Sequence, residues 1–235
     1  MANNYFQFKQ FRIDQDNTSM KVCTDSCVFG AWIKPQDATY MLDIGAGTGL
    51  LSLMLAQRSK AFIDAVEIDE DAAKQAVQNI QRSPWSEKIT VYHKSIQSFA
   101  KHGEKKYDLI ISNPPFYTNY LKSEDAKTNI ALHNTSLSTE ELLQAVTALL
   151  VPKGRFIVLL PSYEAELLRE VALDFNLYTD TIVKIKDHER ANAIREITVF
   201  SYTLEFPKVE ELILKKGETY SEDFVTLLKD YYLNL

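Results

Sequence analysis

The stretch Leu42-Asp43-Ile44-Gly45-Ala46-Gly47-Thr48-Gly49 decides the fold, because it places a glycine-rich turn directly after a short apolar run. Glycine reaches positive φ without strain and carries no Cβ, so the backbone of such a turn can bend sharply and touch a ligand. Turns of this kind join the first strand of a doubly wound α/β sheet to its first helix, at the edge where such sheets bind ligands. We therefore predict a ligand site formed by Gly45, Ala46, Gly47 and Gly49.

On both sides of this turn, β-rich apolar runs alternate with segments of helical periodicity, as in a sheet covered by helices on both faces. Strands are predicted at residues 40–44, 62–68, 89–92, 107–112, 155–160, 181–185 and 197–202. We expect an α/β fold with a doubly wound, seven-stranded, mostly parallel sheet of the Rossmann-like class. The polar connection 187–193 is suited to reverse the chain, so the last strand should be an antiparallel closing strand.

Length and composition predict one folded domain. The 235 residues are 46% hydrophobic and 25% charged, which is near the globular average and sufficient for one α/β core. We treat residues 1–235 as a single domain in which residues 1–38 form an N-terminal extension over the sheet. The sequence contains no signal-peptide pattern and no run of eighteen apolar residues, so we expect a cytoplasmic protein without membrane contact.

Charge and cysteine content disfavour two kinds of site. A net charge of −6 argues against a sequence-independent grip on a long nucleic acid. A small basic face could still contact a nucleic acid, and five residues close together in sequence could form it: Lys184, Lys186, His188, Arg190 and Arg195. A solvated loop explains this cluster equally well. Cys23 and Cys27 lack the second pair or the histidines of a zinc site, so we expect reduced structural thiols and no metal.

Spacing within the glycine turn separates two classes of cofactor. In the dinucleotide fingerprint the third glycine follows the first by five positions, whereas Gly49 follows Gly45 by four. Glu67 ends the next strand roughly 20 residues later, where a carboxylate can accept both hydroxyls of a ribose. Alone, Glu67 would be an ordinary strand-end acid in contact with solvent. Together, the two features predict S-adenosylmethionine, with S-adenosylhomocysteine as product, bound against the turn, Glu67 and Ile68.

Asp43 lies inside an apolar strand, where an unpaired carboxylate is costly. Its partner is either the backbone of the glycine turn or the ammonium group of the cofactor. A purely structural role in orienting the turn explains Asp43 as well, and the sequence leaves both interpretations open.

The segment Asn113-Pro114-Pro115-Phe116 follows the predicted strand 107–112, and we predict that it carries the catalytic chemistry. The lone pair of an adenine exocyclic nitrogen, or of a glutamine amide, is delocalised and must be localised before it can attack a methyl group. The Asn113 side-chain oxygen and the Pro114 carbonyl can each accept one N–H of such a nitrogen. Prolines fix the backbone and Phe116 offers a stacking face for an extruded base. Alternatively, Asn-Pro is also common in plain turns.

With these motifs the chain resembles the class I methyltransferases of the amino-methylating type, and more narrowly the bacterial tRNA(Val) adenine-N6 methyltransferases. The resemblance covers nearly the full length and includes Phe6-Gln7-Phe8-Lys9-Gln10-Phe11 and Met20-Lys21-Val22-Cys23-Thr24-Asp25. It implies methyl transfer from S-adenosylmethionine to N6 of an adenosine in tRNA, next to the anticodon of tRNA(Val). It implies tRNA as partner, and no obligate protein partner is evident.

The resemblance also assigns residues. The segment from Met20 is similar to a lid strand over the cofactor, which makes Lys21, Thr24 and Asp25 cofactor neighbours and lets the extension 1–38 cover the cofactor site. After the third strand, Ser95 stands where relatives put an acid against the cofactor's adenine amine, and the neighbouring Ile96 is expected to contact the cofactor. Substrate contacts are expected from Phe116, Arg190 and Arg195.

Two other functions share some of these features. Protein glutamine-N5 methyltransferases that act on release factors use the same Asn-Pro-Pro-aromatic motif, but they carry a sizeable helical domain ahead of the glycine turn. Here a short extension precedes Tyr40. A non-catalytic adaptor that binds S-adenosylmethionine would be expected to lose Asn113 or the glycines, and the chain keeps both.

Overall fold

The computed structural model describes residues 4–16, 18, 21–35, 37–103, 105–114 and 137–235. Pro115 and Phe116 of the predicted catalytic segment lie outside these residues.

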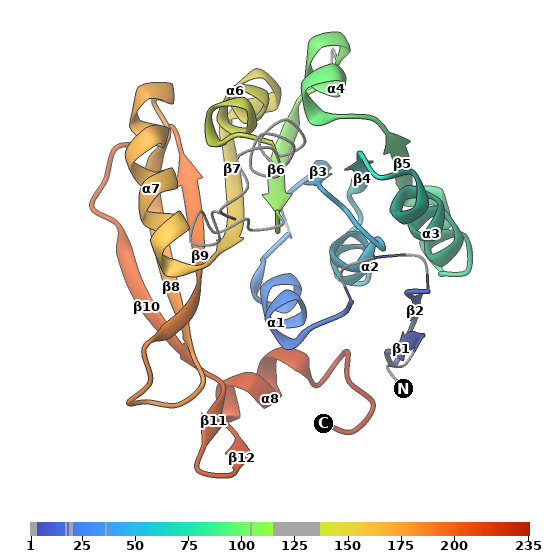
Figure 1. Cartoon of the computed structure of the whole chain (residues 1–235), viewed down its shortest axis with the longest axis vertical. Coiled ribbons are helices and arrows are strands. Elements are labelled where there is room, and N and C mark those ends of the chain that lie inside the picture. The colour runs from blue at the N-terminus through green and yellow to red at the C-terminus, as the bar shows by residue number, and fades with distance from the viewer. Residues whose placement is uncertain (1–3, 17, 19–20, 36, 104, 115–136) are drawn as a thin grey trace, which may run out of the picture.

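An eight-stranded sheet forms the centre of the molecule, with strand order β10-β8-β9-β7-β6-β3-β4-β5 (Figure 1). Its strands are β3 (Tyr40–Ile44), β4 (Phe62–Glu67), β5 (Ile89–His93), β6 (Tyr107–Ser112), β7 (Leu150–Leu160), β8 (Tyr178–Lys186), β9 (Ala193–Ser201) and β10 (Lys208–Ile213). The predicted doubly wound class is confirmed, and β9 runs antiparallel to both β7 and β8, as the closing-strand prediction requires. Strands β3 to β7 pair in parallel.

The predicted number of seven strands is wrong, because β10 adds an eighth strand that pairs in parallel with β8. Its sequence Lys-Val-Glu-Glu-Leu-Ile is mostly exposed, and only Leu212 is buried. An edge strand of this kind carries charges that protect its open side from other chains. Those charges remove the apolar alternation by which a strand is recognised in sequence.

Helices cover both faces of the sheet, each with its own apolar core. One face carries α1 (Thr24–Trp32), α2 (Leu50–Ala56), α3 (Glu70–Gln81) and α8 (Glu222–Leu228), and the other carries α4 (Ile96–His102), α6 (Thr139–Leu149) and α7 (Ser162–Ala172). Short 3-10 turns occupy Ser86–Lys88 and Leu173–Phe175. The capping box of Ser138 and Glu141 is present at the start of α6. Among the described residues, no helix is long and apolar enough to cross a membrane.

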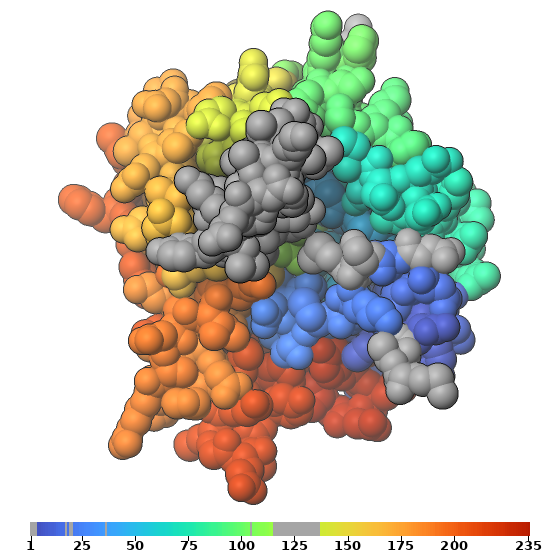
Figure 2. Space-filling view, in the orientation of Figure 1, coloured from blue at the N-terminus to red at the C-terminus, as the bar shows by residue number. Residues whose placement is uncertain are grey.

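The N-terminal extension contains an antiparallel hairpin of β1 (Tyr5–Gln7) and β2 (Arg12–Asp14), followed by α1. Figure 2 shows it between the α3 region and the red C-terminal segment. Thr24 and Asp25 open helix α1, so the expected lid strand is wrong at these two residues. Ser26 to Ala31 are buried, and this burial favours a helix packed on α2 and α8 over an extended lid.

The C-terminal segment packs against the same face. Ser221 caps α8 by accepting the Phe224 amide at 3.0 Å, and the small hairpin β11 (Lys215–Lys216) with β12 (Thr219–Tyr220) precedes it. Beyond the helix, the buried Tyr231 hydroxyl donates to the Met54 carbonyl at 2.8 Å, which fixes the segment to α2.

Candidate active site

The glycine turn lies at the carboxyl end of β3 and has the backbone that its glycines predict. Gly45, Gly47 and Gly49 have φ of 73°, 54° and 82°, in the left-handed region that favours glycine. A Cβ added at Gly45 or Gly47 would meet no atom of the described residues within 4 Å, its two chain neighbours aside, so this part of the structure leaves the turn uncovered. The Gly45 amide donates to the Val66 carbonyl at 2.8 Å, which joins the turn to the end of β4. The turn therefore offers bare backbone to a ligand.

Glu67 ends β4 beside this turn. Its Oε2 accepts the Gly47 amide at 2.8 Å and its Oε1 accepts the Asp69 amide at 2.8 Å. The side chain is largely buried, while the neighbouring Ile68 is 64% exposed. Each carboxylate oxygen retains a further lone pair, so Glu67 can shape the turn and still accept a hydroxyl.

Asp43 is fully buried one strand residue before the turn. Ser52 of α2 donates its hydroxyl to Oδ2 at 2.7 Å, whereas Oδ1 receives no hydrogen bond from the described residues. Burial, aided by the negative charge of Glu67, raises the pKa of Asp43 to about 7, against a lowering by the Ser52 hydrogen bond. A buried carboxylate oxygen without a donor is costly. A cationic ligand beside the turn would satisfy it, and the ammonium group of S-adenosylmethionine fits this requirement.

Asn113 and Pro114 follow β6 at the same edge of the sheet. Ser112 pairs with Ile44 in the register of β6 and β3, and its hydroxyl donates to the Ile44 carbonyl at 2.9 Å. Asn113 is therefore brought next to the glycine turn. Its Nδ2 donates to the Ser26 hydroxyl of α1 at 2.9 Å. The structure thus brings the first two residues of the predicted catalytic segment next to the glycine turn.

The segment around residues 21–26 reaches this edge from α1. Asp25 forms an ion pair with Arg195 of β9, with 3.4 Å between Asp25 Oδ2 and Arg195 Nε. Lys21 and Thr24 are exposed, and the Val22 amide donates to Gln15 Oε1 at 2.9 Å. The structure thus joins Asp25 and Arg195, which the sequence assigned to cofactor and substrate respectively.

The remaining predicted contacts lie further along the edge. Ser95 is the N-cap of α4 and its hydroxyl accepts the Ser98 amide at 3.2 Å, so one of its lone pairs is already used. Ile96 is buried behind it. Arg190 is exposed in the turn between β8 and β9, which projects from the molecule in orange (Figure 2). The described residues contain no group of three acids, histidines or cysteines that could hold a metal ion.

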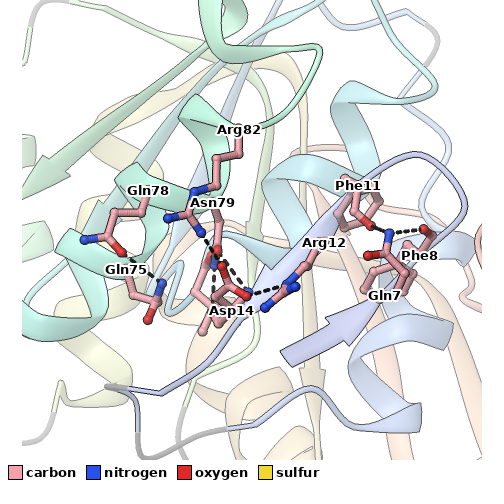
Figure 3. A network of polar contacts seen from close by, with 10 residues as sticks. Gln7, Phe8, Phe11, Arg12, Asp14, Gln75, Gln78, Asn79 and Arg82 are labelled. Carbon is pink, nitrogen blue, oxygen red and sulfur yellow. Dashed lines mark hydrogen bonds and ion pairs between the residues drawn. The ribbon is translucent and has the colours of Figure 1, made fainter. Parts of the chain in front are cut away.

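Asn79 contacts Asp14 of the extension (Figure 3) and Thr48 of the glycine turn, and sequence reasoning missed it. Its Nδ2 donates to the carbonyls of Asp14 and Thr48 at 2.9 Å each, and its Oδ1 accepts the Asp14 amide at 3.0 Å. Arg12 and Arg82 both pair with the Asp14 carboxylate. A polar residue within an amphipathic helix gives no local sign of such a role. The extension is therefore fixed to the turn by one buried amide.

We expect Asn79→Ala to lower the free energy of unfolding by about 3 kcal/mol, because three hydrogen bonds are lost and buried backbone groups of Asp14 and Thr48 remain unpaired. Urea unfolding measures this. Gln78→Ala, which changes an exposed neighbour on α3, is the control and should cost less than about 0.5 kcal/mol. Equal urea midpoints for Asn79→Ala and Gln78→Ala would contradict the role of Asn79 in joining the extension to the glycine turn.

Comparison with known proteins agrees with this geometry. The methyltransferase small domain family matches residues 25–163. The chain is 43% identical to the tRNA1(Val) (adenine(37)-N6)-methyltransferase of Cytophaga hutchinsonii, with 100% of each chain covered. It is 44% identical to the protein of the same name from Dyadobacter fermentans, with 98% of each covered.

Solved structures show the same fold at low sequence identity. A protein from Agrobacterium tumefaciens described as a "predicted O-methyltransferase" superposes with a TM-score of 0.68 at 16% identity, covering 90% of this chain and 100% of the other. TrmN from Thermus thermophilus superposes with a TM-score of 0.51 at 18% identity, covering 71% and 44%. The Rossmann-like methyltransferase fold thus agrees with the sequence relatives: the chain belongs to the methyltransferase small domain family and, within it, to the tRNA1(Val) (adenine(37)-N6)-methyltransferases.

Proposed function

We propose that the protein transfers a methyl group from S-adenosylmethionine to N6 of adenosine 37, next to the anticodon, in tRNA(Val). The observation that carries this proposal is the position of Asn113, whose strand end lies beside the glycine turn and the buried Asp43. The full-length relatives support the choice of tRNA over a release factor, since they carry this activity in their names. A tRNA substrate implies a cytoplasmic enzyme.

The cofactor site consists of residues with complementary tasks. The bare turn at Gly45, Ala46 and Gly47 admits the cofactor against the backbone, and Glu67 accepts hydroxyls of its ribose. Asp43 receives the ammonium group. Bound there, S-adenosylmethionine supplies an electrophilic methyl group on its sulfonium.

Catalysis rests on two neutral acceptors. The Asn113 side-chain oxygen and the Pro114 carbonyl each accept one N–H of the adenine amine. This arrangement draws the nitrogen lone pair out of conjugation and directs it at the methyl group. Methyl transfer leaves the nitrogen cationic, and its acidic proton then passes to water, so no strong general base is needed. Phe116 is proposed to stack on the extruded base.

The proposal includes a contact surface for the RNA. Arg190 lies on the projecting turn between β8 and β9, and Arg195 lies at the foot of this turn on β9. Arg195 shares its charge with Asp25, which leaves the exposed Arg190 as the freer partner for a phosphate.

Cofactor affinity should depend on pH through Asp43. Its pKa of about 7 means that the carboxyl is neutral in acid, whereas an ammonium group favours the carboxylate. Affinity for S-adenosylmethionine should therefore fall about tenfold from pH 7 to pH 5.5, a window in which the cofactor's amine stays protonated. Calorimetry at several pH values measures this. Asp43→Asn should bind more weakly and show a flat profile. If the affinity of Asp43→Asn for S-adenosylmethionine still falls in acid, the group that titrates is not Asp43.

Methylation of purified tRNA tests the function. The protein, S-adenosylmethionine and an unmodified tRNA(Val) transcript should yield N6-methyladenosine by nucleoside mass spectrometry, and a transcript with guanosine at position 37 should yield none. Calorimetry should show that the protein binds S-adenosylmethionine and does not bind NAD. Methylation of a release-factor glutamine instead of tRNA would establish the rival enzyme, and cofactor binding without either product would indicate an adaptor.

A further inference from the structure

Ser26 of α1 lies against the predicted catalytic amide, although it is 87 residues away in sequence. It is 6% exposed, and its hydroxyl oxygen is 2.9 Å from Asn113 Nδ2 and 3.1 Å from the Cys23 sulfur. Asn113 Nδ2 is the donor in the first contact. The extension therefore supplies a buried acceptor to the amide that is proposed to work on the substrate.

The orientation of this amide decides what Asn113 can do. The NH₂ and C=O ends of an asparagine side chain are similar in shape, and rotation by 180° exchanges them. If Asn113 turned its NH₂ group toward the target, two hydrogen-bond donors would face each other, because the adenine amine also presents N–H groups. The lone pair of the target nitrogen would then not be localised. A serine hydroxyl can donate as well as accept, so it selects the opposite orientation when its own proton is directed elsewhere. The Cys23 sulfur, 3.1 Å from the Ser26 oxygen, can take that proton, which leaves the oxygen to accept from Asn113.

We infer that Ser26 is a positioning residue for methyl transfer, because its hydroxyl accepts the Asn113 Nδ2 proton and thereby commits Oδ1 to the target nitrogen. This inference rests on the role of Asn113 under the proposed function and deepens it. Helix α1 packs on α2 and α8, so Ser26 lies on a buried helix that neighbouring helices hold in place. The extension then contributes a residue that positions the chemistry.

Ser26 has few other tasks that would explain its burial. It lies in the first turn of α1, and α1 has no side-chain N-cap hydrogen bond from Cys23. Alanine is the best helix former, so Ser26→Ala should leave the helix intact. The change thus removes the acceptor of Asn113 with little cost in stability.

A double-mutant cycle in single-turnover methylation of tRNA(Val) tests this inference. Ser26→Ala should lower the rate constant about 3- to 30-fold, the range expected when one buried hydrogen bond is lost, while affinity for S-adenosylmethionine stays unchanged. In an Asn113→Ala background the same change should have an effect below about twofold, since no amide remains to be oriented. Ser26→Thr, which keeps the hydroxyl, should restore most of the rate.

Thr147→Ala is the matched control, because among the described residues this helix hydroxyl bonds within α6 alone, to the Leu143 and Gln144 carbonyls. It should leave the rate unchanged, and melting temperatures of all variants show whether they fold. If Ser26→Ala lowers the rate constant by the same factor in the wild type and in Asn113→Ala, or does not lower it at all, the inference is overturned. Asn113 would still keep its proposed role. Near-normal turnover of Asn113→Ala alone would overturn the proposed mechanism, and the inference with it.

Discussion

Asn113→Ala is expected to lower the single-turnover rate of methyl transfer by about 10² to 10³, by analogy with the loss of one positioned group in an oxyanion hole. The side-chain oxygen acts when charge develops on the attacking nitrogen, so its loss raises the barrier more than it weakens binding. Affinity for S-adenosylmethionine should stay within about twofold, because the glycine turn, Asp43 and Glu67 are unchanged. Rapid-quench methylation of a tRNA(Val) transcript and cofactor calorimetry measure the two quantities separately.

Asn234→Ala is a matched control, since it removes the same side chain from an exposed position near the C-terminus. It should methylate at the normal rate. If Asn113→Ala also turns over at close to the normal rate, the segment after β6 is a structural turn and the proposed mechanism fails. If cofactor affinity falls together with the rate, Asn113 acts mainly by holding the cofactor.

The order and type of the central elements were predictable because the relevant signals are local. A parallel strand buried on both faces reads as a short apolar run, and β3 and β6 have the predicted bounds. Strand β7 begins five residues earlier than predicted, in the Val-Pro-Lys-Gly segment that lacks such a run. The edge strand β10 was missed for the same physical reason, since its charged residues face solvent.

The residues of the candidate site fall into two groups for a related reason. Glu67 ends β4 and Asn113 follows β6, and the topology of a parallel sheet alone brings such residues to one edge. Ser26 and Asn79 act through contacts with residues 87 and 65 positions away, respectively, and nothing in their neighbouring sequence marks those contacts. The helix at Thr24 was missed because the resemblance suggested a lid strand, whereas burial of Ser26 to Ala31 against α2 and α8 favours a helix.

Glu67→Ala is expected to weaken binding of S-adenosylmethionine by about 1 to 3 kcal/mol, the usual cost of losing charge-assisted hydrogen bonds. Two causes contribute to this loss. The ribose hydroxyls lose their acceptor, and the amides of Gly47 and Asp69 lose theirs, which loosens the turn. Glu70→Ala, an exposed acid three residues further on and paired with Lys74, is the control and should bind normally.

A change in the ligand separates the two causes. S-adenosylhomocysteine and its 2′-deoxy analogue should differ in affinity for the wild-type protein by about tenfold, because the analogue lacks a hydroxyl for Glu67 to accept. For Glu67→Ala the two ligands should bind alike, since no acceptor remains to distinguish them. If the variant still distinguishes the ligands as strongly as the wild type, another group binds the ribose. The loss on Glu67→Ala would then come from the turn alone, through the two amides that its carboxylate accepts.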